Sequence, residues 1–98
     1  GFLPLKKHRN AVLARIAASA ETTFFYESPH RIVRTLNDLA PLLGDRPVVL
    51  GRELTKLFET VYRGIAASIA VELQKKAAVK GEVVVAVAGT GITIKSIA

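Results

Sequence analysis

A chain of 98 residues, half of them apolar and 22% charged, has the size and composition of one folded domain and not of a disordered tail. It contains no Cys, which excludes a disulfide framework and a thiolate zinc site, and no apolar run approaches the roughly 20 residues that cross a bilayer. Its 14 Lys and Arg against 8 Asp and Glu give a net charge of +6, which favours a polyanionic partner, nucleic acid first. These features predict a cytoplasmic protein with no membrane partner.

The first half of the chain predicts a helix, a strand and a second helix. Residues 9–20 carry apolar side chains at helical spacing among Ala residues. The β-branched and aromatic run 22–26 is apolar at every position after its first two Thr, so it predicts a strand buried on both sides. Ser28 is a good N-cap and Pro29 suits the first helical position, so the next helix is expected to begin there and to end at Gly44.

The second half predicts two strands, a helix and a last strand. Residues 46–54 contain an apolar Pro-Val-Val-Leu run, and 59–65 alternate like a strand. Residues 67–76 predict a helix, and 82–88 give the strongest strand pattern. The order of elements predicts an α/β fold, in which a mixed sheet is flanked by helices and the two consecutive strands form an antiparallel pair.

Residues 25–31, Phe-Tyr-Glu-Ser-Pro-His-Arg, are the first candidate for a functional site. They place a carboxylate, a hydroxyl, an imidazole and a guanidinium between a strand and a helix, where ligands often bind in α/β folds. His30 and Arg31 in a first helical turn do not complement the helix dipole, so they suggest a bound anion or an ion pair with Glu27. The alternative is an ordinary cap with solvated charges.

A second candidate lies at the end of the next strand, at residues 51–56, Gly-Arg-Glu-Leu-Thr-Lys. Arg52 and Lys56 could hold phosphates, and Glu53 could orient Arg52 or a substrate hydroxyl. The alternative is a charged loop. A third feature, the basic run 6–9, could steer phosphates or form a solvated face. The two His residues have no ligand spacing around them, so no metal site is expected.

These segments can be matched together to a known family. Phe2-Leu3-Pro4 with the basic run, then 25–31, 51–59, Arg63-Gly64 and Lys80-Gly81-Glu82 come in one order with similar spacing. The series resembles the small-subunit ribosomal RNA (cytidine-2'-O-)-methyltransferase family of the tetrapyrrole methylase superfamily. Members have two α/β domains with S-adenosylmethionine in the cleft between them, and they form homodimers.

The resemblance implies that residues 1–89 are the C-terminal domain of such an enzyme and that 90–98 are a tail of uncertain structure. The Gly-rich cofactor loops of the N-terminal domain have no counterpart here, so the fragment is expected to be inactive alone. By position, the cofactor-binding residues are Tyr26, Glu27, Arg52, Val87, Ala88 and Gly89. The candidates for contacts to ribosomal RNA are Lys6, Lys7, Arg9, Arg31, Arg52 and Lys56.

Methyl transfer to a ribose hydroxyl is mainly a task of positioning, which a nearby base can assist. Glu27, His30 and Glu53 are the candidate bases, and Tyr26 could stack on a nucleobase or on adenine. Two other functions stay open at this point. One is a corrin or porphyrin precursor methylase, whose polyanionic substrate would also suit basic loops. The other is a non-catalytic RNA-binding module.

Overall fold

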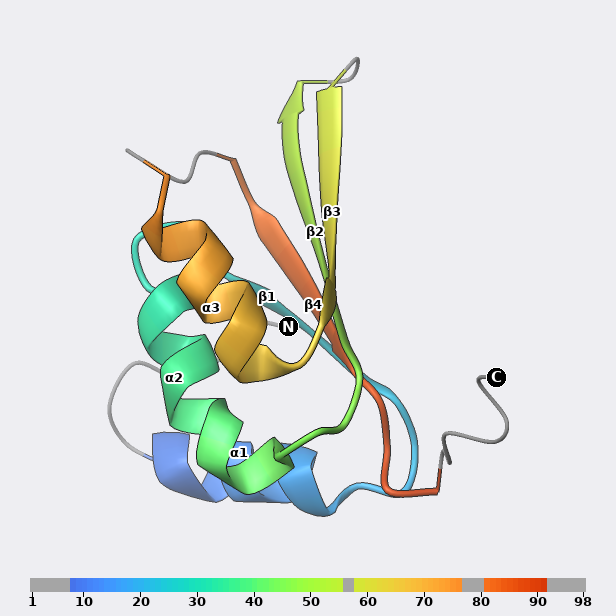
Figure 1. Cartoon of the computed structure of the whole chain (residues 1–98). Helices are drawn as coiled ribbons and strands as arrows, with labels where there is room; N and C mark the ends of the chain where they lie inside the picture. Colours follow the sequence, from blue (N-terminus) through green and yellow to red (C-terminus); the bar gives the residue numbers. More distant parts are fainter. Residues whose placement is uncertain (1–7, 56–57, 77–80, 92–98) are drawn as a thin grey trace.

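The computed structural model describes residues 8–55, 58–76 and 81–91 of the chain. In chain order, the described elements are α1 (Arg9–Ala18), β1 (Thr23–Glu27), α2 (Ile32–Leu43), β2 (Val48–Thr55), β3 (Phe58–Gly64), α3 (Ala66–Gln74) and β4 (Val83–Val87) (Figure 1). This is the order predicted from the sequence, and the α/β class is confirmed. Within the described ranges, every helix is too short or too polar to cross a membrane.

The four strands form one sheet in the order β1-β4-β2-β3. The β2–β3 pair is antiparallel, as expected for two strands joined by a short connection. The last strand, β4, lies between β1 and β2 and pairs antiparallel with both. As a result, β1 and β2 run in the same direction on either side of β4, and their C-terminal ends reach the same edge of the sheet.

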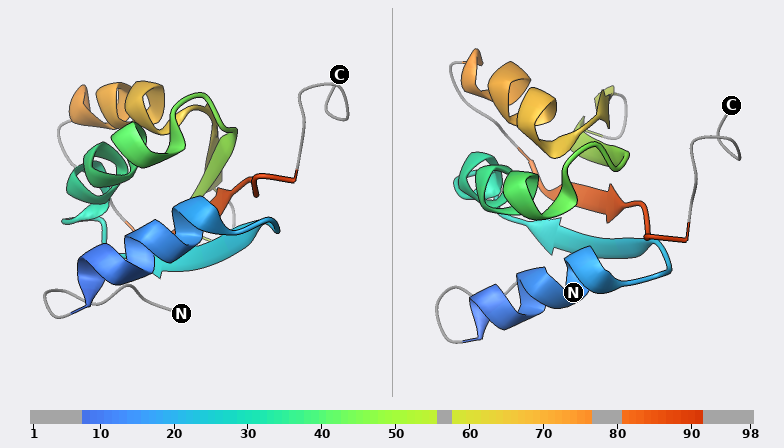
Figure 2. Two further views of the ribbon diagram at one scale, coloured as in Figure 1. Left: turned by 90° about the horizontal axis from the view of Figure 1, so that it is seen from below. Right: turned by 60° about the horizontal axis from the view of Figure 1, so that its bottom comes forward.

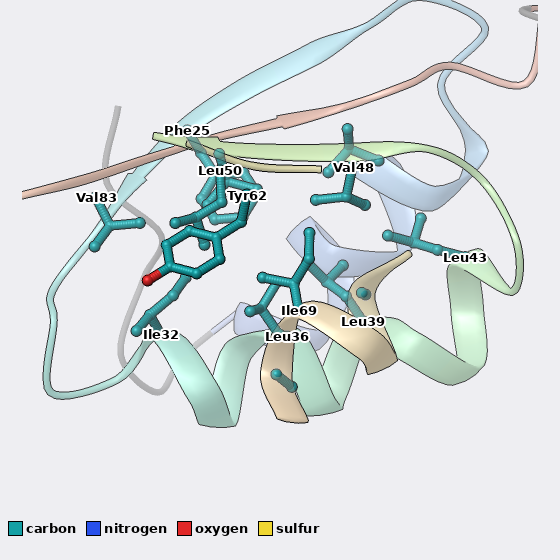
Figure 3. Close-up of a cluster of buried hydrophobic side chains, with 14 of the residues drawn as sticks. Phe25, Ile32, Leu36, Leu39, Leu43, Val48, Leu50, Tyr62, Ile69 and Val83 are labelled. Atoms are coloured by element: carbon teal, nitrogen blue, oxygen red, sulfur yellow. The ribbon is translucent and has the colours of Figure 1, made fainter. Parts of the chain in front are cut away.

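Helices α2 and α3 pack together on one face of this sheet, which we call the inner face (Figures 1 and 2). Figure 3 shows the core between these two helices and the sheet, where helix side chains point toward strand side chains. Its fully buried members include Leu36, Leu39, Leu50, Ile69 and Val85. Helix α1 packs against α2, and its Leu13 and Ile16 are buried there.

The described helices leave the opposite face of the sheet open, and we call it the open face. The prediction that residues 22–26 are buried on both sides is wrong, because Phe24 is 66% exposed and Tyr26 is 43% exposed. Val49, Val61 and Val84 are also exposed on this side. An apolar run without alternation does not reveal that only one face of a strand is covered.

Helix α2 begins at Ile32, so the predicted start at Pro29 with Ser28 as N-cap is wrong. Residues 28–31 form a turn instead. The Ser28 hydroxyl accepts a hydrogen bond from the backbone N–H of His30 at 3.1 Å, and the Ser28 carbonyl accepts one from Arg31 at 3.0 Å. Ser28 therefore caps a turn that leads into the helix. The predicted end at Gly44 is confirmed, with φ 58° at that residue.

The chain after β4 returns to the end of α1. The backbone N–H of Thr90 donates to Ser19 O at 2.8 Å, and that of Gly91 donates to Ala20 O at 3.2 Å. Gly89 is buried at this contact, where an added Cβ would lie 2.3 Å from Ala20 O. Thr90 and Gly91 are the first two residues of the predicted tail 90–98. Residues 92–98 of that tail lie outside the described residues.

Candidate functional site

The two candidate segments meet across β4 at one edge of the sheet. Tyr26 of β1 and Gly51 of β2 both lie opposite Val84, and the next residues, Glu27 and Arg52, both lie opposite Val83. Neighbouring strands are about 4.8 Å apart, so the two segments are about 10 Å from each other across the sheet. Their proximity follows from the common direction of β1 and β2.

Neighbouring residues of β1 face opposite sides of the sheet, and this separates Tyr26 from Glu27. Side chains alternate between the faces of a strand. Tyr26 therefore lies on the open face, and Glu27 lies on the inner face with only 1% of its surface exposed. Two residues that were predicted to share one cofactor site are thus on opposite sides of the sheet.

The buried carboxylate of Glu27 is fully engaged in hydrogen bonds. Its Oε1 accepts from the backbone N–H of Ser28 at 2.7 Å and from Nε of Arg31 at 3.2 Å. Its Oε2 accepts from the hydroxyl of Thr35 at 2.6 Å. A buried charge requires such partners, since an unpaired one is costly in a protein interior. The carboxylate fixes the turn after β1 and holds the guanidinium of Arg31, which is 39% exposed, at the edge of the sheet.

The same network continues to α1 through Arg9. Its Nη2 donates to the hydroxyl of Thr35 at 2.9 Å and lies 3.3 Å from Oδ2 of Asp38. Only 8% of Arg9 is exposed. Arg9 was predicted to contact RNA, but its described contacts lie within the chain and connect α1 to α2.

On the open face, the structure has a hollow of about 420 Å³. The residues that line it come from all four strands and the residue before β4; they include Tyr26, Gly51, Arg52, Val61, Glu82 and Val84. Tyr26 and Arg52, both predicted for a site, are both among its lining residues, although Arg52 is in the row of Glu27 and Val83, whose side chains face inward. The Nε of Arg52 is buried and has no hydrogen-bond partner among the described residues. This is the candidate functional site.

The predicted cofactor segment Val87, Ala88 and Gly89 lies at the other end of the sheet. Because β4 runs antiparallel to β1 and β2, its last residue, Val87, lies opposite their first residues. Val87 is 1% exposed in the core, and the small size of Gly89 is explained by its contact with the Ala20 backbone. The six predicted cofactor residues therefore do not form one site within the chain.

The remaining predicted residues have varied positions. His30 is exposed in the turn after β1. Glu53 lies in β2 opposite Glu59, and its side chain is not among those described. Lys6, Lys7 and Lys56 lie outside the described residues. Among the residues that are described, no group of three or more His, Asp or Glu could hold a metal ion.

Sequence reasoning did not assign Val61, Glu82 and Val84 to a site, and it gave Gly51 no role of its own within the candidate segment 51–56. One signal was present in the sequence: Gly51 lies inside a predicted strand, and a glycine there often marks a close approach by a ligand or another backbone. The valines carry no such signal, because an exposed valine and a buried one look alike in a strand pattern.

Known proteins match nearly the whole chain, although no protein-family model matches it. It is 44% identical over 91 residues to the ribosomal RNA small subunit methyltransferase I of Micromonospora olivasterospora, covering 92% of the chain and 29% of that protein. Proteins of the same name from Halalkalibacterium halodurans and Thermotoga maritima are 44% and 36% identical, over 93% and 91% of the chain and 32% and 40% of their own lengths. The chain thus spans about a third of the length of these curated relatives. It is homologous, over nearly its whole length, to one segment of the ribosomal RNA small subunit methyltransferase I proteins, which confirms the resemblance drawn from its motifs.

Proposed function

We propose that this chain is the C-terminal domain of an enzyme that transfers a methyl group from S-adenosylmethionine to the 2'-hydroxyl of a cytidine in small-subunit ribosomal RNA. The observation that carries the proposal is the 36–44% identity to three proteins named as methyltransferases of that RNA, over more than 90% of the chain. The net charge of +6 supports a polyanionic substrate. The proposal includes a homodimer of the full-length protein and a cytoplasmic location.

The described residues do not provide a complete site for S-adenosylmethionine. The predicted cofactor residues lie at two ends of the sheet, Glu27 faces the interior, and Gly89 is packed against the chain itself. We therefore assign most of the cofactor contacts to the part of the full-length protein beyond this chain. This agrees with the expectation that the fragment alone has no activity.

The chain's own contribution, in this proposal, is to position RNA. Glu27 acts as a positioning residue, since its enclosed carboxylate holds Arg31 at the edge of the sheet. Arg31 and Arg52 then serve as contacts for the RNA backbone. Of the three candidate bases, His30 is exposed and Glu27 is enclosed, so His30 and Glu53 remain assigned to any proton transfer.

The two alternative functions have less support. A corrin or porphyrin precursor methylase would be expected to match proteins of that name, whereas the relatives given above are named for ribosomal RNA. A non-catalytic RNA-binding module would need no methyltransferase around it, yet each relative carries this segment within a methyltransferase that is about three times as long.

A chimeric enzyme tests the proposal. This chain would replace the homologous 92-residue segment of the Halalkalibacterium halodurans relative, to which it is 44% identical. We expect the chimera to transfer labelled methyl groups to small-subunit ribosomal RNA, and nuclease digestion with mass spectrometry to yield 2'-O-methylcytidine. The relative without the segment is the negative control.

The presence of a new methyl group on the RNA, and the atom that carries it, distinguish between the possible functions. A folded chimera that binds S-adenosylmethionine but methylates no RNA would contradict the proposal. Methylation on a base would support a methyltransferase function but would show that the 2'-hydroxyl is not its target. Titration calorimetry on the isolated chain adds a second check, because we expect no binding of S-adenosylmethionine at micromolar concentrations.

A further inference from the structure

Gly51 occupies a position that the chain itself does not explain. It lies inside β2, a central strand, where glycine destabilises by roughly 0.5–1 kcal/mol relative to alanine. Its φ is not in the left-handed region, and an added Cβ would meet no atom within 4 Å. Gly89 differs, because the Ala20 backbone leaves no room for a side chain there. Neither backbone conformation nor packing within the described residues accounts for the glycine at position 51, which leaves space for a group from outside the chain.

The missing side chain leaves a notch in the open face. Four residues lie in one row across the sheet: Tyr26, Val84, Gly51 and Val61. Gly51 separates the two valines, and these residues line the hollow of about 420 Å³. Two strand spacings span about 10 Å, which is wide enough for a planar ring to lie on the strand backbone between apolar walls.

The polar groups at this notch suit a nucleobase. Glu82 lines the hollow, and a carboxylate there repels phosphate but accepts a hydrogen bond from an exocyclic amino group of a base. Arg52 also contributes to the lining, but it shares its row with Glu27 and Val83, so its side chain faces the inner side of the sheet. An amino-bearing base thus has a hydrogen-bond acceptor, Glu82, within the hollow.

A second aromatic residue and a second cation lie on the same face. Phe24 is two residues before Tyr26 on β1 and is 66% exposed, so the Cα atoms of the two residues are about 7 Å apart along the strand. Arg63 is exposed in β3 and shares its row with Val49 of β2. Aromatic side chains on an open sheet, with cations at the margin, match the way single-stranded RNA is bound through the faces of its bases.

We propose that the hollow over Gly51 binds an amino-bearing nucleobase of single-stranded RNA, with that base against Tyr26 and its neighbour on Phe24. This inference deepens the proposed function, since it names the surface through which the chain holds its RNA. Duplex RNA is excluded, because its base faces are stacked inside the helix. The occupant is a base and not a phosphate, because Glu82 borders the hollow.

The test measures RNA binding by the 98-residue chain. Fluorescence anisotropy would follow a labelled single-stranded RNA of about ten nucleotides, with the same sequence as a duplex for comparison. Gly51→Val fills the notch, and Tyr26→Ala removes a stacking surface. Val71→Ala is the matched control, because Val71 is 51% exposed but lies on α3. Circular dichroism and urea unfolding check that each variant is folded.

We expect Gly51→Val and Tyr26→Ala each to weaken binding of the single strand about tenfold, and Val71→Ala to leave it unchanged. The salt dependence of binding should stay the same in both weakened variants, since neither removes a phosphate contact. If Gly51→Val does not fold, Tyr26→Ala still decides the matter.

Three results would overturn the inference. They are unchanged affinity in the folded variants, equally tight binding of duplex RNA, and no RNA binding by the unaltered chain. A chimera that carries Gly51→Val separates this inference from the proposed function. Normal methylation with lost RNA affinity in the isolated chain would reject the hollow as the substrate surface, while the methyltransferase assignment would stand.

Discussion

The inner and open faces of the sheet are built from the same strands and similar residues, yet they differ in what they contact. Leu50 on the inner face is fully buried under the helices, and its neighbour Val49 on the open face is 38% exposed. Glu27 and Tyr26 differ in the same way, with the charged residue inside and the aromatic residue outside. The inner face stabilises the fold, and its one buried carboxylate named here, that of Glu27, is bound by Ser28, Arg31 and Thr35. The open face has exposed apolar and aromatic groups, and these are the groups that we assign to binding.

The largest expected effect compares Glu27 with Tyr26. Glu27→Ala should lower the free energy of unfolding by about 4 kcal/mol, because it leaves the buried hydroxyl of Thr35 and the partly buried donors of Ser28 and Arg31 without their acceptor. Tyr26→Ala should lower it by less than about 1 kcal/mol. Urea unfolding followed by circular dichroism measures both free energies. Equal losses would show that the open face contributes as much to stability as the inner face does.

The next pair tests the apolar part of each face. Leu50→Ala should cost about 3 kcal/mol, since it leaves a cavity between the sheet and the two helices. Val49→Ala removes a partly exposed side chain and should cost less than about 1 kcal/mol. The same unfolding experiment applies. A large loss for Val49→Ala would indicate that the open face is covered in solution.

The two glycines give a smaller and more specific contrast. Gly89→Ala should destabilise by about 2 kcal/mol, because the new Cβ would overlap Ala20 O and the backbone must move. Gly51→Ala should stabilise by about 0.5 kcal/mol, because the position has room and alanine restricts the unfolded chain. Thermal unfolding midpoints should therefore shift in opposite directions. A loss of stability in Gly51→Ala would supply an internal reason for glycine and weaken the case for a ligand.

The smallest effect concerns the turn after β1. Ser28→Ala should cost about 0.5 kcal/mol, since the hydroxyl accepts one exposed hydrogen bond from His30. Ser19, whose hydroxyl makes a similar bond to the backbone of Glu21, is the matched comparison. A loss above about 2 kcal/mol for Ser28→Ala alone would mean that Ser28 caps helix α2 directly.

Much of the fold could be predicted from the sequence, because hydrophobic period and breaker residues are local properties. The type and order of all seven described elements agree with the prediction, and the end of α2 at Gly44 was predicted from one residue. Which face of a strand is covered is not local. Thr-Thr-Phe-Phe-Tyr reads as a strand either way, and only the packing of α2 and α3 decides that Phe25 is buried and Phe24 is exposed.

The candidate site was predicted only in part, because the direction of each strand in the sheet could not be predicted from the sequence. The motifs around Tyr26 and Arg52 lie at the same edge because β1 and β2 run in the same direction, although β4 lies between them. Val87 to Gly89 were grouped with them, but β4 is reversed, and its direction depends on long-range pairing. Glu27 was expected among the catalytic candidates because a carboxylate beside cations suggests chemistry. Its buried partners, Thr35 and the backbone of Ser28, could not be inferred from residue types alone.

The central position of β4 has a consequence for the order in which the domain can form. Strand β1 pairs only with β4 among the described strands, and the β2–β3 hairpin joins the sheet through β4 as well. A ribosome synthesises β4 last of the four, so β1 has no partner among the described strands until residues 83–87 have emerged. Such late, long-range pairing slows folding and leaves strand edges exposed during synthesis. A nascent chain that is stopped before Val83 would hold two separate β segments and no continuous sheet.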